Sequence, residues 1–152
     1  MNASAKLCSY CLIAFASIFA MTSAARPPAT LSEGPDFSDL MIGIKKSMKT
    51  VSLSIEDPAA SARALAAVNE MEVMLLAAKT HEPSNLNEVP RADRKAHATA
   101  FRVDLAKTLI ETLKLEIAIL EGRRDEAMSY VRGSLRDMRD AGHDKYMPGE
   151  DG

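Results

Sequence analysis

The most constraining feature of this chain is a regular spacing of apolar residues between positions 37 and 55. The apolar residues follow one another at steps of four, three, four, three and four: Phe37, Met41, Ile44, Met48, Val51 and Ile55. Such alternating steps keep side chains on one face of an α-helix for about five turns. The spacing therefore predicts an amphipathic helix whose stripe faces a partner helix.

Three further segments have helical spacing, and the residues around them mark their ends. Asp57-Pro58 ends the first helix and begins the second, with Asp as the cap and Pro at the first helical position. Gly122 ends the third helix just after Glu121. The second helix is expected at about 58–80 and the fourth at about 123–146. The third is expected to begin between residues 91 and 98 and to end at residue 121.

Each of these helices has an expected buried face. The second buries Leu65, Val68, Met71, Leu75 and Ala78, the third Phe101, Leu105, Leu109, Leu113, Ile117 and Leu120, and the fourth Ala127, Val131, Leu135 and Met138. Trp is absent, aromatic residues make up 5% of the chain, and no strand pattern competes. Only a few residues separate helices one and two, or three and four, and such short connections force antiparallel neighbours. Residues 36–147 are thus expected to form an all-α, antiparallel up-down-up-down four-helix bundle.

The N-terminus is typical of a secretory signal. Lys6 precedes an apolar run from Leu7 to Met21, and the small residues Thr22-Ser-Ala-Ala25 follow. The alternative is an uncleaved membrane anchor, because the run approaches the length that spans a bilayer. We interpret 1–25 as a signal peptide, 26–35 as a disordered lead-in rich in Pro and small residues, and 148–152 as a disordered tail.

Cysteine placement and charge exclude several classes of protein. Both cysteines, Cys8 and Cys11, lie within the expected signal peptide, so the mature chain has no disulfide and no thiolate ligand. The formal net charge of −2, from 19 basic and 21 acidic residues, argues against a nucleic-acid surface. No pairing of nucleophile and base is visible, which argues against an enzyme.

Two residues far apart in the sequence are expected to meet at one end of this bundle. Met41 lies about 7 Å from the start of the first helix and His143 about 5 Å from the end of the last, at 1.5 Å per residue. A thioether and an imidazole in one layer can hold a haem iron from opposite sides. Taken singly, a methionine at the position of Met41 is usually part of the core packing, and a histidine at the position of His143 is more often a surface or helix-end histidine.

Three other features at the same end are candidates for binding a cofactor or a metal ion. Phe101, near the start of the third helix, can wall the same layer. Arg139 lies one turn before His143, where it can pair with a haem propionate or remain a solvated charge. His81 and His97 both lie near the loop 81–90, but no spacing of carboxylates or thiolates supports a metal pair there.

These residues carry a resemblance to a known family. Asp36-Phe-Ser-Asp-Leu-Met41, Phe101-Arg102 and the closing Arg139-Asp-Ala-Gly-His143-Asp-Lys-Tyr146 resemble segments of the periplasmic cytochrome b562 family. The resemblance covers about residues 36–146. Gly142 and Leu105 depart from it, because the family has aromatic residues at both places.

The resemblance implies a periplasmic electron-transfer protein with one noncovalent b-type haem. Met41 and His143 would be its axial iron ligands, with Phe101 and Arg139 contacting the porphyrin. We expect a monomer that binds neither nucleic acid nor, once the signal is removed, a membrane, and whose redox partners in the periplasm are unidentified. The alternative from another class is a haem-free periplasmic helical bundle that acts as a chaperone, a metal buffer or an interaction module.

Overall fold

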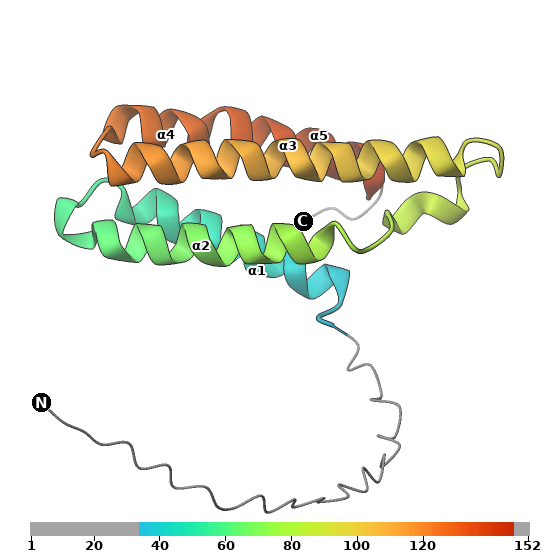
Figure 1. Cartoon of the computed structure of the whole chain (residues 1–152), viewed down its shortest axis with the longest axis horizontal. Coiled ribbons are helices and arrows are strands. Elements are labelled where there is room, and N and C mark those ends of the chain that lie inside the picture. Colours follow the sequence, from blue (N-terminus) through green and yellow to red (C-terminus); the bar gives the residue numbers. More distant parts are fainter. Residues whose placement is uncertain (1–33, 148–152) are drawn as a thin grey trace, which may run out of the picture. The chain divides into compact units, whose positions relative to one another are not determined.

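A computed structural model describes residues 34–147 of the chain, which belong to one unit (Figure 1). The predicted signal peptide at 1–25, all but the last two residues of the predicted lead-in at 26–35, and the predicted tail at 148–152 lie outside the described residues.

The described residues form helices and contain no strand. The elements are α1 (Phe37–Ser54), the 3-10 turn η1 (Pro58–Ala60), α2 (Ser61–Ala78), the 3-10 turn η2 (Ser84–Asn87), α3 (Arg94–Leu120), α4 (Arg124–Arg132) and α5 (Ser134–Tyr146). α1 packs along α2, while α4 and α5 follow one another along α3 (Figure 1). The predicted all-α class and helical bundle are confirmed. Among the described helices, none is both long and apolar enough to cross a membrane.

The predicted helix boundaries at Pro58 and Gly122 are confirmed with their caps. The Asp57 carboxylate accepts a hydrogen bond from Ala59 N at 2.9 Å, and Pro58 begins the turn that leads into α2. Gly122 has a φ of 69°, a left-handed conformation that glycine adopts without steric cost. Arg123 N then donates to Ala118 O over 2.8 Å, which closes the end of α3 and lets α4 turn back.

The prediction of one continuous helix at 123–146 is wrong, because Gly133 divides this segment into α4 and α5. Gly133 has a φ of −108° and a ψ of −103°, outside the helical region. A Cβ at this position would lie 2.8 Å from the backbone oxygen of Ser129, closer than real Cβ atoms come. Glycine is therefore required at the break between α4 and α5.

The core lies between the helices and follows the predicted faces of α2 and the last segment. Of the predicted stripe of α1, Val51 and Ile55 are in the core, whereas its first four members are half-buried. The core consists of Val51, Ile55, Ala64, Ala67, Val68, Met71, Leu75, Leu115, Ala118, Ala127, Val131 and Leu135. On α2 the expected Leu65 is only half-buried, because Ala64 and Ala67 face the neighbouring helices instead.

The predicted buried face of α3 is wrong in its second half. Leu113, Ile117 and Leu120 are 41%, 48% and 62% exposed, whereas Thr112, Leu115 and Ala118 are buried. Successive steps of four residues rotate by about 40° each around an α-helix, because 3.6 residues make one turn. A stripe that begins in the core at Phe101 therefore turns outward, and the residues buried in this half follow one another at steps of three.

Candidate cofactor cavity

A cavity of about 590 Å³ opens where α1 and α5 meet α2 and α3. Its walls are mainly apolar, and several of them come from the predicted stripe of α1. The apolar lining consists of Phe37, Met41, Ile42, Ile44, Met48, Met71, Leu75, Phe101, Leu105, Leu135, Met138 and Met147. The side chains around Leu115 thus pack into a closed core, whereas the side chains around Met41 line a cavity.

All four residues that the sequence singled out line this one cavity. Met41 reaches it from the second turn of α1, and His143 reaches it from the last turn of α5. Both side chains are half-buried. A thioether sulfur and an imidazole, the two types of ligand considered above, are therefore presented to the same space from different helices.

Phe101 and Arg139 occupy the wall and the rim of the cavity. Phe101 is 3% exposed and packs edge-on against Phe37 and Tyr146, with ring centroids 5.6 Å and 5.0 Å away. Arg139 is exposed, and its Nε donates to Asp140 Oδ1 over 2.8 Å. Arg139 thus lines the cavity and pairs with Asp140. The sequence had suggested a partner in a haem propionate or a solvated charge, and it did not indicate the pair with Asp140.

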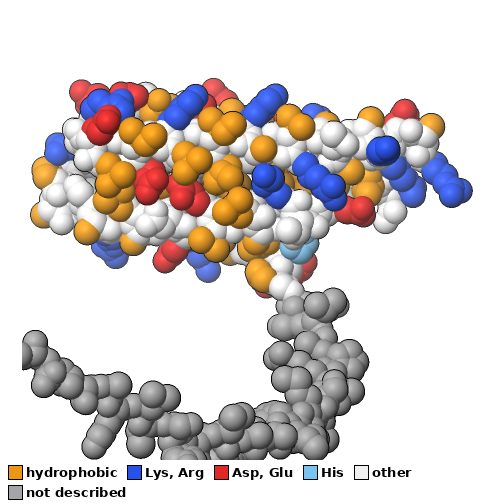
Figure 2. Space-filling model, viewed as in Figure 1, with side chains coloured by type: hydrophobic (Ala, Val, Ile, Leu, Met, Phe, Trp, Pro, Cys, Tyr) orange, Lys and Arg blue, Asp and Glu red, His pale blue; other side chains and the backbone are white. Residues whose placement is uncertain are grey.

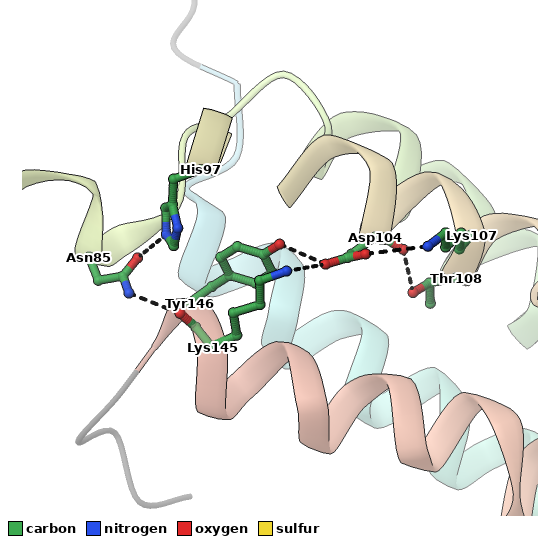
Figure 3. A network of polar contacts seen from close by, with 7 residues as sticks. All are labelled: Asn85, His97, Asp104, Lys107, Thr108, Lys145 and Tyr146. Carbon is green, nitrogen blue, oxygen red and sulfur yellow. Dashed lines mark hydrogen bonds and ion pairs between the residues drawn. The ribbon is translucent and has the colours of Figure 1, made fainter. Parts of the chain in front are cut away.

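A polar network next to Phe101 was missed by sequence reasoning (Figure 3). Tyr146 Oη donates to Asp104 Oδ2 over 2.6 Å, and Lys145 Nζ donates to the same oxygen over 2.9 Å. Asn85 Nδ2 donates to Lys145 O over 2.9 Å, which joins η2 to the end of α5. The only available signal was Asp104 on the inward face of α3, three residues after Phe101.

This network shifts the pKa values of its members. Burial alone raises the pKa of Asp104, but the hydrogen bonds from Tyr146 and Lys145 and the charges of Lys145 and Lys107 outweigh it and hold that pKa below its ordinary value. Burial raises the pKa of Tyr146, and its hydrogen bond to Asp104 raises that pKa further. Asp104 is therefore ionised and Tyr146 neutral at pH 7, as this hydrogen bond requires.

His81 and His97 contact different aromatic rings. The His81 ring lies 5.8 Å from Phe37, whereas His97 packs on Tyr146 at 5.2 Å. His97 Nε2 is 2.9 Å from Asn85 Oδ1, so its ring already has a polar partner. Within residues 34–147 no group of three His, Cys, Asp or Glu side chains is arranged to hold a metal ion.

A basic groove of about 720 Å³ adjoins the cavity between α1 and the last two helices, and it was not predicted from the sequence. Six basic side chains and no acidic one line it: Lys45, Lys46, Lys49, Arg132, Arg136 and Arg139. Lys45 and Arg139 line the cavity as well. Glu56 and Asp140, beside the groove, pair with Arg132 and Arg139. A chain with a net negative charge therefore presents a positive surface beside its cavity.

No protein-family model matches this chain, and no curated protein matches it.

Proposed function

We propose that the chain is a periplasmic electron-transfer protein that holds one noncovalent b-type haem, with Met41 and His143 as the axial ligands of the iron. The observation that carries the proposal is that these two residues, from α1 and α5, line the same cavity. We also propose that the chain is related to the cytochrome b562 family, which it resembles, and that its helices run in an antiparallel up-down-up-down order. Short connections between α1 and α2 and between α3 and α4 support that course.

The residues around the cavity suit a porphyrin in size and chemistry. The volume of about 590 Å³ falls within the roughly 300–1,000 Å³ of ordinary ligand pockets. Phe101, Leu105 and Leu135 offer apolar contact to a flat macrocycle, and Lys45 and Arg139 stand at the rim, where propionates would reach solvent. The cysteines at 8 and 11 lie in the predicted signal peptide, so attachment would be noncovalent.

The two ligands explain why the proposal is electron transfer and not catalysis. When bound, the haem would supply one-electron exchange at its iron. Met41 offers a soft thioether that favours the ferrous state, and His143 offers an imidazole that binds both oxidation states. If Met41 and His143 both held the iron, no open position would be left for a substrate.

The basic groove supports an encounter with an acidic redox partner. Lys46 and Lys49 project from α1 beside the cavity, and Arg136 projects from α5. A predominantly positive surface of this kind attracts oppositely charged partners and raises their association rate. We infer that the unidentified periplasmic partners approach through this groove.

Haem titration of ligand variants tests the proposal. The purified protein should bind one haem per chain, His143→Ala should lose most of the affinity, and Met41→Ala should bind haem with an altered spectrum. Met128→Ala and His97→Gln are matched controls, because neither Met128 nor His97 lines the cavity. Unchanged titration and spectra in both ligand variants would contradict the assignment and leave a haem-free helical protein as the better account.

A further inference from the structure

The apolar cavity and the basic groove meet at a set of shared side chains. Ile42, Lys45, Met48 and Arg139 line both of them. Spaces of about 590 Å³ and about 720 Å³ therefore adjoin across these four residues. An elongated ligand can extend from one space into the other.

The two spaces differ in the chemistry of their walls. The cavity has mainly apolar walls, with Lys45 and Arg139 at its rim. The groove has three apolar residues, Ile42, Met48 and Val131, and its other lining residues are Ser52 and six cations. A ligand that suits both spaces has an apolar body and an anionic head group.

The cations of the groove are compensated on one side only. On the side of α4 and α5 all three arginines are in ion pairs, Arg132 with Glu56, and Arg136 and Arg139 with Asp140. On the side of α1, three lysines are in no ion pair within residues 34–147: Lys45, Lys46 and Lys49. The charge that an anion can neutralise therefore lies mainly on α1.

The spacing along α1 places these lysines beside the entrance to the cavity. Ile42, Lys45 and Lys49 follow one another at steps of three and four residues, so they share one face of the helix. Met48 is three residues after Lys45 and lines both spaces. A head group held by Lys45 and Lys49 would thus lie within one turn of the apolar side chains that lead into the cavity.

The face formed by α2 and α3 differs from the groove in its charges. Figure 2 shows apolar, basic and acidic side chains mixed along these two helices. Charge complementarity therefore favours no particular ligand on that face, whereas it favours an anion in the groove.

We propose that the joined space binds a single-chain anionic amphiphile such as a long-chain fatty acid, with its chain in the cavity and its head group between Lys45 and Lys49. Entry into the cavity removes the chain from water. The two ammonium groups donate charge-assisted hydrogen bonds to the head group. This ligand goes beyond the proposed haem and does not depend on it. Both would occupy the cavity, so each binds to the chain only in the absence of the other.

Calorimetric titration with palmitate tests the site. The protein comes from a host that makes no haem, so the result is independent of the proposed function. Palmitate, kept below the concentration at which it forms micelles, should bind once per chain with a dissociation constant on the order of 1–10 µM. Octanoate should bind at least 100-fold more weakly because its chain is shorter, and hexadecanol at least tenfold more weakly because it has no charge. Palmitate that fails to bind, or that binds no more tightly than hexadecanol, would overturn the proposal.

Charge variants on α1 locate the head group. Lys45→Glu with Lys49→Glu should weaken palmitate binding about tenfold or more and leave hexadecanol binding unchanged. A general loss of structure would weaken both. Arg91→Glu with Lys95→Glu changes the same number of charges outside both spaces and is the matched control. Equal palmitate affinities in the two double variants would contradict the placement of the head group on α1.

An apolar variant locates the chain. Ile42, which is 49% exposed, lines both spaces, so Ile42→Glu should weaken palmitate and hexadecanol alike, about tenfold or more. Leu53→Glu is the matched control, because Leu53 lies on the same helix, is 70% exposed and lines neither space. If Ile42→Glu bound both amphiphiles as tightly as Leu53→Glu does, the chain would not pass between the groove and the cavity, and the proposal would fail.

Two further probes separate the sources of such a ligand. Palmitoyl lysophosphatidic acid carries the same chain on a phosphate, and tighter binding of this lipid or of palmitate identifies the preferred head group. Vesicles of phosphatidylglycerol present anionic head groups on a surface. Binding to these vesicles without binding of either single-chain lipid would overturn the proposal and assign the groove to a lipid surface instead.

Discussion

Tyr146 Oη donates a hydrogen bond to Asp104 Oδ2 over 2.6 Å, and this bond joins the last residue of α5 to α3. The Tyr146 ring is 3% exposed and packs against Phe101 on the cavity wall. His143 lies three residues earlier on the same helix, so the bond fixes the turn that carries the proposed ligand. The bond thus positions His143, and both Tyr146 and Asp104 also line the cavity.

Removal of this hydroxyl should loosen the end of α5. Tyr146→Phe leaves the ring in place but removes a hydrogen bond to a carboxylate, so the free energy of unfolding should fall by about 1–2 kcal/mol in urea titrations. Haem affinity should fall as well. Tyr130→Phe is the control, because the Tyr130 hydroxyl bonds to Glu126 within α4, and neither residue lines the cavity. If both variants lost equal stability and equal haem affinity, the Tyr146 bond would contribute no more than a local bond within α4.

The same pair should make stability depend on pH in a defined range. The pKa of folded Asp104 lies below its ordinary value of 3.8, so the ionised carboxylate stabilises the fold above that value. The contribution is lost as the pH falls through the folded pKa. The difference in free energy of unfolding between wild type and Asp104→Asn should therefore be constant above about pH 5 and shrink below it. A difference that grows on acidification would contradict the hydrogen-bond assignment.

Two glycines of the last segment should respond to alanine in opposite directions. At Gly133 a Cβ would meet Ser129 O at 2.8 Å, so Gly133→Ala should destabilise the protein by about 1 kcal/mol or more. At Gly142, inside α5, a Cβ meets nothing within 4 Å. Gly142→Ala should stabilise by about 0.5–1 kcal/mol, because alanine favours helix. Thermal melts of both variants decide the matter, and a shift of the same sign in both would count against the break at Gly133.

If haem binds, the basic groove should control the rate of oxidation by anionic reagents. Lys46→Glu with Lys49→Glu should slow oxidation of the reduced protein by ferricyanide about tenfold at low ionic strength. The difference should nearly vanish above about 0.5 M salt, because ions screen the charges. Arg91→Glu with Lys95→Glu changes the same number of charges outside the groove and serves as the control. Equal rates for the two double variants would exclude the groove as the docking surface.

The sequence predicted the helices well because their signals are local. The alternating spacing of α1, the Asp57-Pro58 boundary and Gly122 each act within one or two turns, and all three are confirmed. The exposed half of α3 could not be predicted, because that helix carries apolar residues on two faces. Which face is buried depends on the direction from which α2 and the last segment approach.

The candidate site was likewise predictable from the sequence only in part. Met41 and His143 could be assigned to one end from helix lengths alone, and both line the cavity. Asp104 could not be connected with Tyr146, nor Asn85 with Lys145, because these hydrogen bonds join residues 42 and 60 positions apart. The basic groove was equally hidden, since its cations come from α1 and from the last two helices, and only the fold gathers them.

The most direct test of the central claim is the reduced-minus-oxidised absorbance spectrum of the protein purified from the periplasm of a host that makes haem. The account predicts a low-spin haem with sharp Soret and α bands in the reduced form, and complete extraction of the colour by acid acetone. Loss of the low-spin bands in Met41→Ala and of the haem itself in His143→Ala should accompany it. A protein that stays colourless even after incubation with excess haem, or a colour that remains covalently attached, would contradict the account.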